Sequence, residues 1–395
     1  MRAGKYIRQT TGYSAFIPVP LPPKPPIRMD TNLISLLSDA DRALGRLDGV
    51  TSVLPNPNLF VAMYVRQEAV LSSQIEGTQS TLEDVLEYEV EGKVQDKPGD
   101  VAEVVNYVEA MNYGINRLET LPLSLRLIKE IHSELLTGVR GSHRNPGQFR
   151  RTQNWIGSAN STLSNAEFVP PPPNEMKLAL GELENFLHNK KLFPSLIHCG
   201  LAHAQFETIH PFLDGNGRVG RLLITLLLCE RHILQRPLLY ISYYFKAHHA
   251  QYYDRLTAIR NDGDWEGWLK FFLKGVYEVS LTAANTAREI LSLREKLREK
   301  IGHNLSGSTN GLMLLDYLYE QPVISIRMAE KHLGCAYVTA ASLITDLEKL
   351  GILREITGHQ RHRRYRFEQY LELFKKQALT GTEQKKLDDG SKSNK

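Results

Sequence analysis

Cysteine is scarce in this sequence, and its placement does not suggest a binding site. Cys199, Cys229 and Cys335 are widely separated, lack the spacing of metal ligands and lie in apolar segments with helical patterns. We therefore interpret them as reduced thiols of the core, which favours a cytoplasmic protein over a disulfide-stabilised one.

Strong net charge and long apolar runs are also missing. The formal net charge is +4 over 395 residues, so bulk electrostatics commit the chain neither to nucleic acid nor to membranes. The longest apolar run, residues 222–229, is far too short to span a bilayer, and we expect no signal peptide because the N-terminus has no long apolar core. The composition, 42% hydrophobic and 23% charged, is typical of a soluble protein with two or three structural units.

One segment concentrates the chemistry of the chain, His210-Pro211-Phe212-Leu213-Asp214-Gly215-Asn216-Gly217-Arg218-Val219-Gly220-Arg221. Its glycines allow a tight turn whose N–H groups approach phosphate oxygens, and the apolar residues that follow predict a helix with its positive end at the anion. Both arginines lie on the first helical turn and can point at one polyphosphate.

Two further groups of this segment suit nucleotide chemistry. Asp214 is a single hard carboxylate, suited to an Mg2+ ion that takes its other ligands from phosphate and water. His210 is the only group in the segment whose ordinary pKa lets it accept a proton near neutrality. The segment therefore predicts a site for a nucleoside triphosphate, whereas a plain turn between two core helices would explain only the glycines.

The segment resembles the signature of the Fic family, His-Pro-Phe-x-(Asp/Glu)-Gly-Asn-Gly-Arg-x-x-Arg, and every specified position is filled. The resemblance implies transfer of AMP from ATP to a Ser, Thr or Tyr hydroxyl of a protein. It makes His210 the general base, Asp214 the Mg2+ ligand and Arg221 the contact of the terminal phosphate. The other ATP-binding residues that it implies are Gly215, Asn216, Gly217 and Arg218.

Other functions remain as alternatives to AMP transfer. A relative that removes AMP or phosphorylates its target would share the signature, although kinase-like members depart from Gly-Asn-Gly at the position of Gly217, which is unchanged here. A transcription regulator that uses the Fic unit only to sense a nucleotide is a second alternative.

A second signal lies upstream, in residues 71–77. Ser72 and Glu76 are four residues apart, on one face of a helix predicted from about Asn58 to Ile75 and ended by Gly77. The segment resembles the inhibitory motif of the Fic family, (Ser/Thr)-x-x-x-Glu-(Gly/Asn), whose Glu pairs with the last Arg of the signature. The resemblance implies that Glu76 inhibits its own chain, while the alternative is an ordinary exposed Glu at a helix end.

Helical periodicity breaks between Gly147 and Pro173, where β-type residues and four prolines predict the one β-hairpin of a helical protein. Its position resembles the Fic flap, onto which a target segment adds as a strand. The alternative is a surface hairpin without a partner. The target-docking residues implied are Asn154, Trp155, Ile156 and Gly157.

The adenine side of the site is less clearly marked. Tyr253 and Asn261 resemble the residues that follow the signature helix in the family. Tyr252 and Tyr253 are adjacent and cannot share a helix face, so at most one stacks on the base. We favour Tyr253, although a tyrosine in the core is the commoner case.

The character of the chain changes after Gly307. Residues 312–320, 325–333 and 338–350 predict three helices, and residues 351–367 predict a basic hairpin, which together indicate a winged helix. The recognition helix carries few cations, so DNA binding and a protein-interaction or dimer module remain open. The basic cluster of the wing consists of His359, Arg361, His362, Arg363, Arg364 and Arg366.

These patterns predict an all-α protein with a β-hairpin flap and a C-terminal winged helix. The predicted parts are a proline-rich arm (1–32), a helical region with the inhibitory helix (33–120), a Fic catalytic domain (121–280), a connecting helix (281–304), a winged helix (305–376) and a disordered polar tail (377–395). Ser80 with Glu83, and Asp100 with Glu103, predict capping boxes. Expected partners are ATP and a hydroxyl-bearing target protein, with DNA and a second copy of the chain as further candidates and no membrane.

Overall fold

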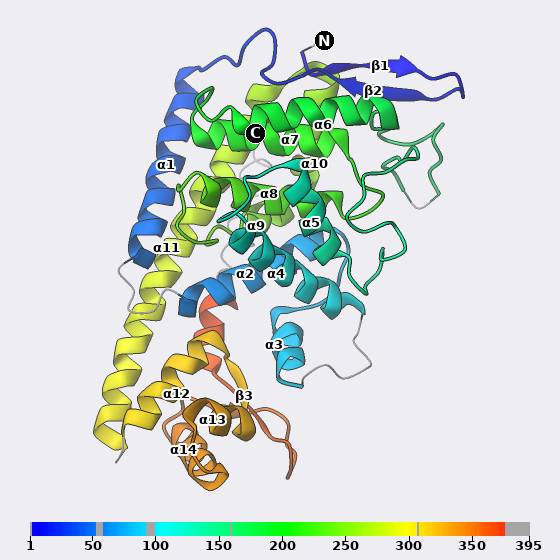
Figure 1. Cartoon of the computed structure of the whole chain (residues 1–395). Coiled ribbons are helices and arrows are strands. Elements are labelled where there is room, and N and C mark those ends of the chain that lie inside the picture. The colour runs from blue at the N-terminus through cyan, green and yellow to red at the C-terminus, as the bar shows by residue number, and fades with distance from the viewer. Residues whose placement is uncertain (1, 53–57, 92–98, 159, 306–307, 376–395) are drawn as a thin grey trace, which may run out of the picture.

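The computed structural model describes residues 2–52, 58–91, 99–158, 160–305 and 308–375, and it is mainly helical (Figure 1). The predicted all-α class is confirmed, with two small antiparallel sheets added. The predicted tail, residues 377–395, lies outside the described residues. No described helix combines the length and the hydropathy needed to cross a membrane.

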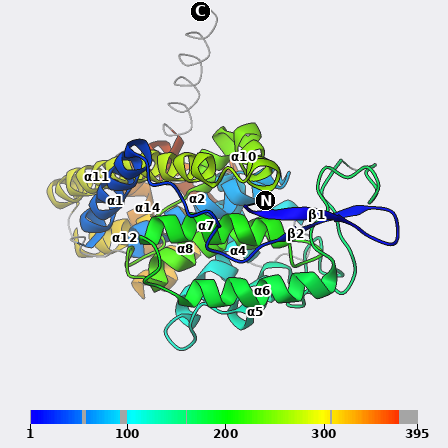
Figure 2. The ribbon, with the colours of Figure 1, turned by 90° about the horizontal axis from the view of Figure 1, so that it is seen from above.

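Two long helices, α1 (Thr31–Ser52) and α11 (Trp265–Asn304), lie side by side along one side of the molecule in both views (Figures 1 and 2). Asp264 caps α11 by accepting a hydrogen bond of 2.9 Å from the N–H of Gly267. The predicted connecting helix, residues 281–304, is the second half of α11 and not a separate element. The reason is that its buried stripe, which includes Val276, Ala283 and Ile290, continues without interruption.

The centre of the fold is α7 (Ser195–Ile209), whose residues are all buried apart from the first. A helix that is buried all round belongs in the middle of a helical assembly, and other helices surround it. The helices that pack against α7 are α1, α11, α6 (Pro173–His188), α8 (Asn216–Glu230) and α10 (His249–Asp262). The other helices before the C-terminal unit are α2 (Asn58–Ile75), α3 (Leu82–Glu91), α4 (Gly99–Arg117), α5 (Leu125–Leu135) and α9 (Ser242–Ala247). The predicted bounds of the inhibitory helix agree with α2, and Gly77 follows it with φ 95°.

The N-terminal segment differs from the predicted extended arm. Strands β1 (Gly4–Arg8) and β2 (Ser14–Pro18) form an antiparallel hairpin, and only the proline-dense residues 19–30 lack regular structure. The neighbouring residues Ala15 and Phe16 of β2 are both completely buried, and the ring of Phe16 packs on Phe168. The hairpin is therefore part of the packed fold.

The flap also differs from its prediction as a hairpin. Between residues 147 and 173 the only pairing described is one antiparallel bridge that joins Ile156 and Phe168. The next residue, Val169, accepts a hydrogen bond of 2.9 Å from the N–H of Phe16 in β2. The flap is thus an irregular segment that the N-terminal hairpin supports from one side.

The C-terminal unit is the winged helix that the sequence predicts. Its helices are α12 (Ser308–Glu320), α13 (Ile326–Leu333) and α14 (Tyr337–Lys349). Ser325 caps the N-terminus of α13, and its hydroxyl accepts a hydrogen bond from the N–H of Met328. The wing strands β4 (Arg354–Glu355) and β5 (Arg364–Arg366) are joined by a short strand that the sequence did not reveal, β3 (Val323–Ser325), in the order β3-β5-β4.

Candidate active site

His210 ends α7 and begins the signature loop. Its backbone is left-handed, with φ 51° and ψ 61°, and its N–H donates to the carbonyl of Phe206 at 2.9 Å. The ring nitrogen Nδ1 is buried and has no hydrogen-bond partner among the described residues. Burial, aided by the positive charge of Arg150, lowers the pKa of His210 to about 4. The imidazole is therefore neutral near pH 7 and able to accept a proton.

The backbone around His210 is held by two flap residues. Arg150 is 2% exposed, and its Nε donates to the carbonyl of His210 at 3.0 Å. The side-chain amide of Asn154 donates to the carbonyl of Phe212 at 2.9 Å and, more weakly, to that of His210 at 3.4 Å. Asn154 thus supports the signature loop, and its role in docking a target stays a prediction.

The signature loop closes on itself through Asn216. Its Oδ1 accepts from the N–H of Phe212 at 2.8 Å, and its Nδ2 donates to the carbonyl of the same residue at 2.9 Å. Gly215, with φ 76°, adopts the left-handed conformation that starts α8. The side chain of Asn216 is used to hold the loop, so a phosphate contact from this residue would come from its backbone N–H.

An ion pair between a buried arginine and a partly exposed carboxylate joins the two predicted inhibitory elements. The Nη2 of Arg221 lies 2.6 Å from Oε1 of Glu76, and Nε of Arg221 donates to the hydroxyl of Ser72 at 2.7 Å. The arginine is 1% exposed. Burial would raise the pKa of Glu76, yet the charge of Arg221 outweighs it and holds the pKa below its ordinary value. Glu76 contacts the guanidinium through Nη2, which also donates to the carbonyl of Ser72 at 3.0 Å, and not bidentately.

The carboxylate of Glu76 also lies at the N-terminus of α8. A Cβ atom added to Gly217, the second residue of that helix, would lie 2.2 Å from Oε1 of Glu76. The free N–H groups and the positive dipole at a helix N-terminus attract anions. Glu76 therefore occupies the place where the signature predicts phosphate, and only glycine at position 217 allows this approach.

Arg218 is held by a carboxylate that the sequence analysis missed. Its Nη1 lies 3.1 Å from Oε2 of Glu103 in α4, and both side chains are 2% exposed. Its Nη2 lies 3.4 Å from Oδ1 of Asp214. Glu103 is thus a buried partner of the signature and not the capping residue predicted from Asp100. The other predicted capping box is shifted by one residue, because Thr81 and Asp84 bond each other's backbone N–H groups.

Asp214 fits the role of a lone metal ligand. Its side chain is 36% exposed, and it is acceptor-rich, hard and paired only with Arg218 at 3.4 Å. Among the described residues no group of three His, Cys, Asp or Glu side chains could hold a metal ion. An ion beside Asp214 would therefore take most of its ligands from phosphate and water, as Mg2+ commonly does.

His132 of α5 fixes the loop from the opposite side. The N–H of Gly147 donates to its Nδ1 at 2.8 Å, so its Nε2 carries the proton and donates to the carbonyl of Asp214 at 3.0 Å. The ring stacks on Phe212 with centroids 3.7 Å apart, and burial lowers the pKa of His132 to about 4. A single histidine on an amphipathic helix gives no sequence signal for such a role.

The predicted adenine-side residues lie in different settings. Tyr252 is buried, and its hydroxyl contacts Nε2 of His203 at 2.9 Å, which makes it a core residue. Tyr253 is 36% exposed, and its pKa is raised by burial and, to a smaller extent, by the charge of Glu76. The exposed Asn261 accepts a hydrogen bond of 3.3 Å from the hydroxyl of Tyr6 in β1.

The remaining flap residues differ in exposure. Trp155 is 42% exposed and donates from Nε1 to the carbonyl of Ser161 at 3.0 Å. Ile156 uses both its N–H and its carbonyl to pair with Phe168. Gly157 lies opposite Ser161, whose hydroxyl a Cβ would meet at 2.6 Å. The exposed ring of Trp155 is therefore the part of the predicted docking segment that is presented to solvent.

Comparisons with known proteins agree with this arrangement. Residues 34–116 match the Fic/DOC family N-terminal region, residues 122–228 match the Fic/DOC family, and residues 312–366 match an HTH DNA binding domain. The chain is similar to proteins named protein adenylyltransferase Fic: it is 33% identical over 154 residues to that of Aedes aegypti and 32% identical over 209 residues to that of Drosophila grimshawi.

These matches cover only part of each protein. They include 38% and 50% of this chain, and they span 27% and 38% of the length of the two relatives. The fold is similar to the crystal structure of a Fic family protein from Desulfovibrio desulfuricans, with a TM-score of 0.55 at 19% identity over 87% of this chain and 97% of the other.

Proposed function

Because the chain belongs to the Fic/DOC family, we propose that it is a protein adenylyltransferase, which transfers AMP from ATP to a Ser, Thr or Tyr hydroxyl of target proteins and of itself. We propose further that Glu76 restrains this transfer. The observation that carries the proposal is the position of Glu76, whose carboxylate lies on both Arg221 and the N-terminus of α8. A carboxylate held there stands where the signature would bind a phosphate group.

The proposed reaction forms one bond and breaks one bond. The oxygen of the target hydroxyl attacks the α-phosphorus of ATP, while the imidazole of His210 accepts the hydroxyl proton. The bond between the α-phosphorus and the oxygen that bridges to the β-phosphorus breaks, and pyrophosphate leaves. A neutral His210 suits the task, because its pKa of about 4 leaves the ring unprotonated near pH 7.

The other residues supply position and charge. The first N–H groups of α8 and the guanidinium of Arg221 would hold the phosphates once Glu76 has moved away. Asp214 would hold Mg2+, which when bound would neutralise part of the phosphate charge. Glu103 and His132 keep Arg218 and the carbonyl of Asp214 in place, at 3.1 and 3.0 Å. In such transfers the protein contributes mainly alignment and charge stabilisation.

Radiolabel transfer separates this proposal from the alternatives. Incubation of the Glu76→Gly variant with Mg2+ and either α-labelled or γ-labelled ATP should label protein only with the α-label, because AMP carries the α-phosphorus. Label from γ-labelled ATP would instead indicate phosphorylation. Absence of both labels, with ATP binding retained, would favour a nucleotide sensor.

A further inference from the structure

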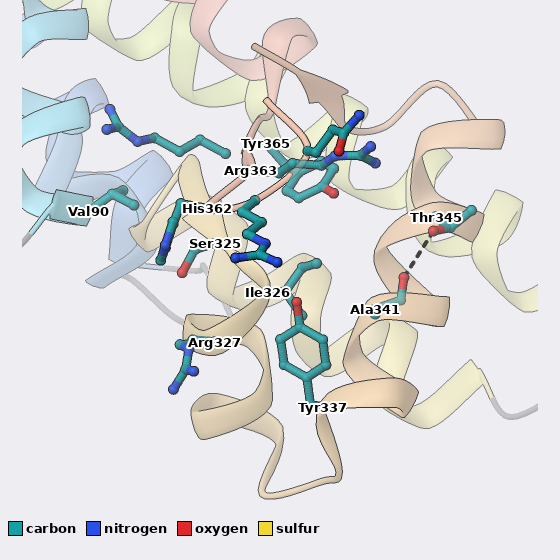
Figure 3. A pocket seen from close by; sticks show the side chains of 13 residues that line it. Val90, Ser325, Ile326, Arg327, Tyr337, Ala341, Thr345, His362, Arg363 and Tyr365 are labelled. Atoms are coloured by element: carbon teal, nitrogen blue, oxygen red, sulfur yellow. Dashed lines mark hydrogen bonds between the residues drawn. The ribbon is translucent and has the colours of Figure 1, made fainter. Parts of the chain in front are cut away.

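A cavity lies in the C-terminal unit, and cationic side chains line it (Figure 3). It measures about 920 Å³ and lies between α13, α14 and the wing, with Val90 of α3 on a further wall. Tyr337, Ala341 and Thr345 follow one another along a single face of α14. We call this space the wing groove.

Arginines of two elements line the wing groove. Arg327 comes from the first turn of α13, and Arg361 and Arg363 come from the wing. All three are exposed, and no ion pair joins any of them to a carboxylate within the described part of the chain. Several arginines without a carboxylate partner in the described chain lie on this concave surface, beside an exposed helix face. Such a surface fits the phosphate backbone of a nucleic acid better than it fits an acidic peptide.

The third wall of the groove belongs to the helix that follows the inhibitory turn. Helix α3 carries Glu87, whose carboxylate lies 3.8 Å from Arg364 of the wing. It also carries Glu83, which lies 2.8 Å from Lys375 at the end of the described chain. Acidic side chains of α3 therefore already face the cations of the winged helix.

Helix α2 packs directly against the same unit. Arg66 of α2 pairs with Glu89 of α3 at 2.8 Å, and it also donates to the carbonyl of Glu320 at the end of α12, at 3.3 Å. The ring of Tyr64 in α2 meets the ring of Phe374 edge to face at 5.8 Å. Figure 1 shows α2 and α3 between the winged helix and the signature helix α8.

The turn that links α2 to α3 is tied to α2 and to α4. The side-chain amide of Gln74 donates to the carbonyl of Ser80 at 2.8 Å, and the N–H of Gln79 donates to Asp100 of α4 at 2.8 Å. Glu76 lies within this tied segment, one residue before Gly77. A displacement of α3 would act on the turn that carries Glu76, because that turn leads directly into α3.

We propose that the wing groove binds the phosphate backbone of duplex DNA, and that this binding releases Glu76 from Arg221 through α3. The regulatory half rests on the proposed AMP transfer. Phosphates in the groove compete with Glu87 for Arg364 and repel the carboxylates of α3, so DNA binds better when α3 has moved away. A ligand that prefers one of two states shifts the protein toward that state, and the coupling acts equally in both directions.

The binding half is tested with the full-length chain and a fluorescein-labelled mixed-sequence duplex, followed by fluorescence anisotropy. Arg361→Ala with Arg363→Ala should weaken binding to all sequences alike and flatten the logarithmic salt dependence by about two units, roughly one for each phosphate that is no longer neutralised. The matched control, Arg46→Ala with Lys177→Ala, removes two exposed cations of α1 and α6 and should change neither quantity. Absence of affinity at low salt would overturn the DNA assignment and favour a protein partner.

The regulatory half is tested by intact-mass spectra of the chain after incubation with ATP and Mg2+, with and without the same duplex at saturation. DNA should raise AMP incorporation in the wild type by about 5-fold or more, as expected for a coupling between sites. It should add little to Glu76→Gly, in which the restraint is already gone.

Two results would contradict the coupling. One is equal incorporation with and without bound DNA in the wild type, and the other is an equal DNA response in Glu76→Gly. Glu87→Gln should raise incorporation without DNA, whereas Glu182→Gln on the exposed face of α6 should not. If Glu76→Gly incorporates no AMP at all, the proposed enzymatic function fails instead, and the anisotropy result still decides the binding half.

Discussion

At the scale of single residues, the backbone of His210 is held by hydrogen bonds, whereas no described residue holds its imidazole ring in this way. Its carbonyl is fixed by Arg150 and Asn154, while Nδ1 of its ring has no partner among the described residues. The ring is thus kept neutral by burial and remains free to take a proton. Substitution of the ring should leave the loop intact.

His210→Ala should therefore abolish AMP transfer and leave ATP binding in place when tested in a Glu76→Gly background. Loss of general-base assistance alone costs roughly 10²-fold to 10⁴-fold in rate. The rate is followed by intact-mass spectrometry and ATP binding by calorimetry. Transfer at the rate of the parent variant would remove His210 from the mechanism.

Glu103 is the residue whose role the sequence least reveals. A polar residue three positions after Asp100 has the spacing of a capping box, and burial cannot be read from that spacing. In the structure Glu103 is the buried partner of Arg218. Removal of one member of a buried ion pair leaves the other charge uncompensated.

Glu103→Gln should consequently lower the free energy of unfolding by about 3 kcal/mol or more, as for other broken buried pairs. Glu109→Gln, at an exposed position of the same helix, is the matched control and should lie within about 0.5 kcal/mol of the wild type. Urea unfolding followed by tryptophan fluorescence measures both. A value for Glu103→Gln as small as that of the control would show that Arg218 does not depend on this carboxylate.

At the scale of elements, prediction succeeded where a local signal determines the element. Periodicity and a terminal glycine predicted α2 with its observed bounds, and the three helices of the winged helix follow from the same kind of pattern. The pairing of Glu76 with Arg221 was also predicted, because a recognisable motif marks it, whereas the contact of Ser72 with Arg221 was not.

Prediction failed where an element depends on a distant partner. Strands β1 and β2 are short. They contact the flap through the hydrogen bond from Phe16 to Val169, which joins segments that are far apart in sequence. The flap has one bridge in place of a hairpin for the same reason, since β2 supplies part of its support. Arg150 and His132 escaped notice because their partners are backbone carbonyls, which carry no sequence signal.

The packing of the N-terminal hairpin can be tested at its centre. Phe16→Ala removes a fully buried ring and should lower the free energy of unfolding by about 3–5 kcal/mol. Ile7→Ala on the exposed side of β1, where the residue is 38% exposed, should cost much less. Equal small effects in urea unfolding would indicate an arm that is not packed, as the proline content alone had suggested.

At the scale of the whole molecule, α2 is the helix that contacts both the winged helix and the signature segment. One end contacts the winged helix through Tyr64 and Arg66, and the other end places Glu76 on the signature helix. A restraint that is part of such a helix is sensitive to anything that binds at either end. In the proposed account the site is restrained, because the carboxylate of Glu76 lies on Arg221 and at the N-terminus of α8.

The effect of Glu76→Gly on AMP incorporation tests this account most directly. Removal of the carboxylate frees Arg221 and the N-terminus of α8, so intact-mass spectra after incubation with ATP and Mg2+ should show faster incorporation than in the wild type, by roughly 5-fold to 150-fold. Arg221→Ala should not reproduce the gain, because it releases the restraint and removes the phosphate contact together. Equal or lower incorporation in Glu76→Gly would contradict the account and would indicate that Glu76 acts in removing AMP from a modified protein.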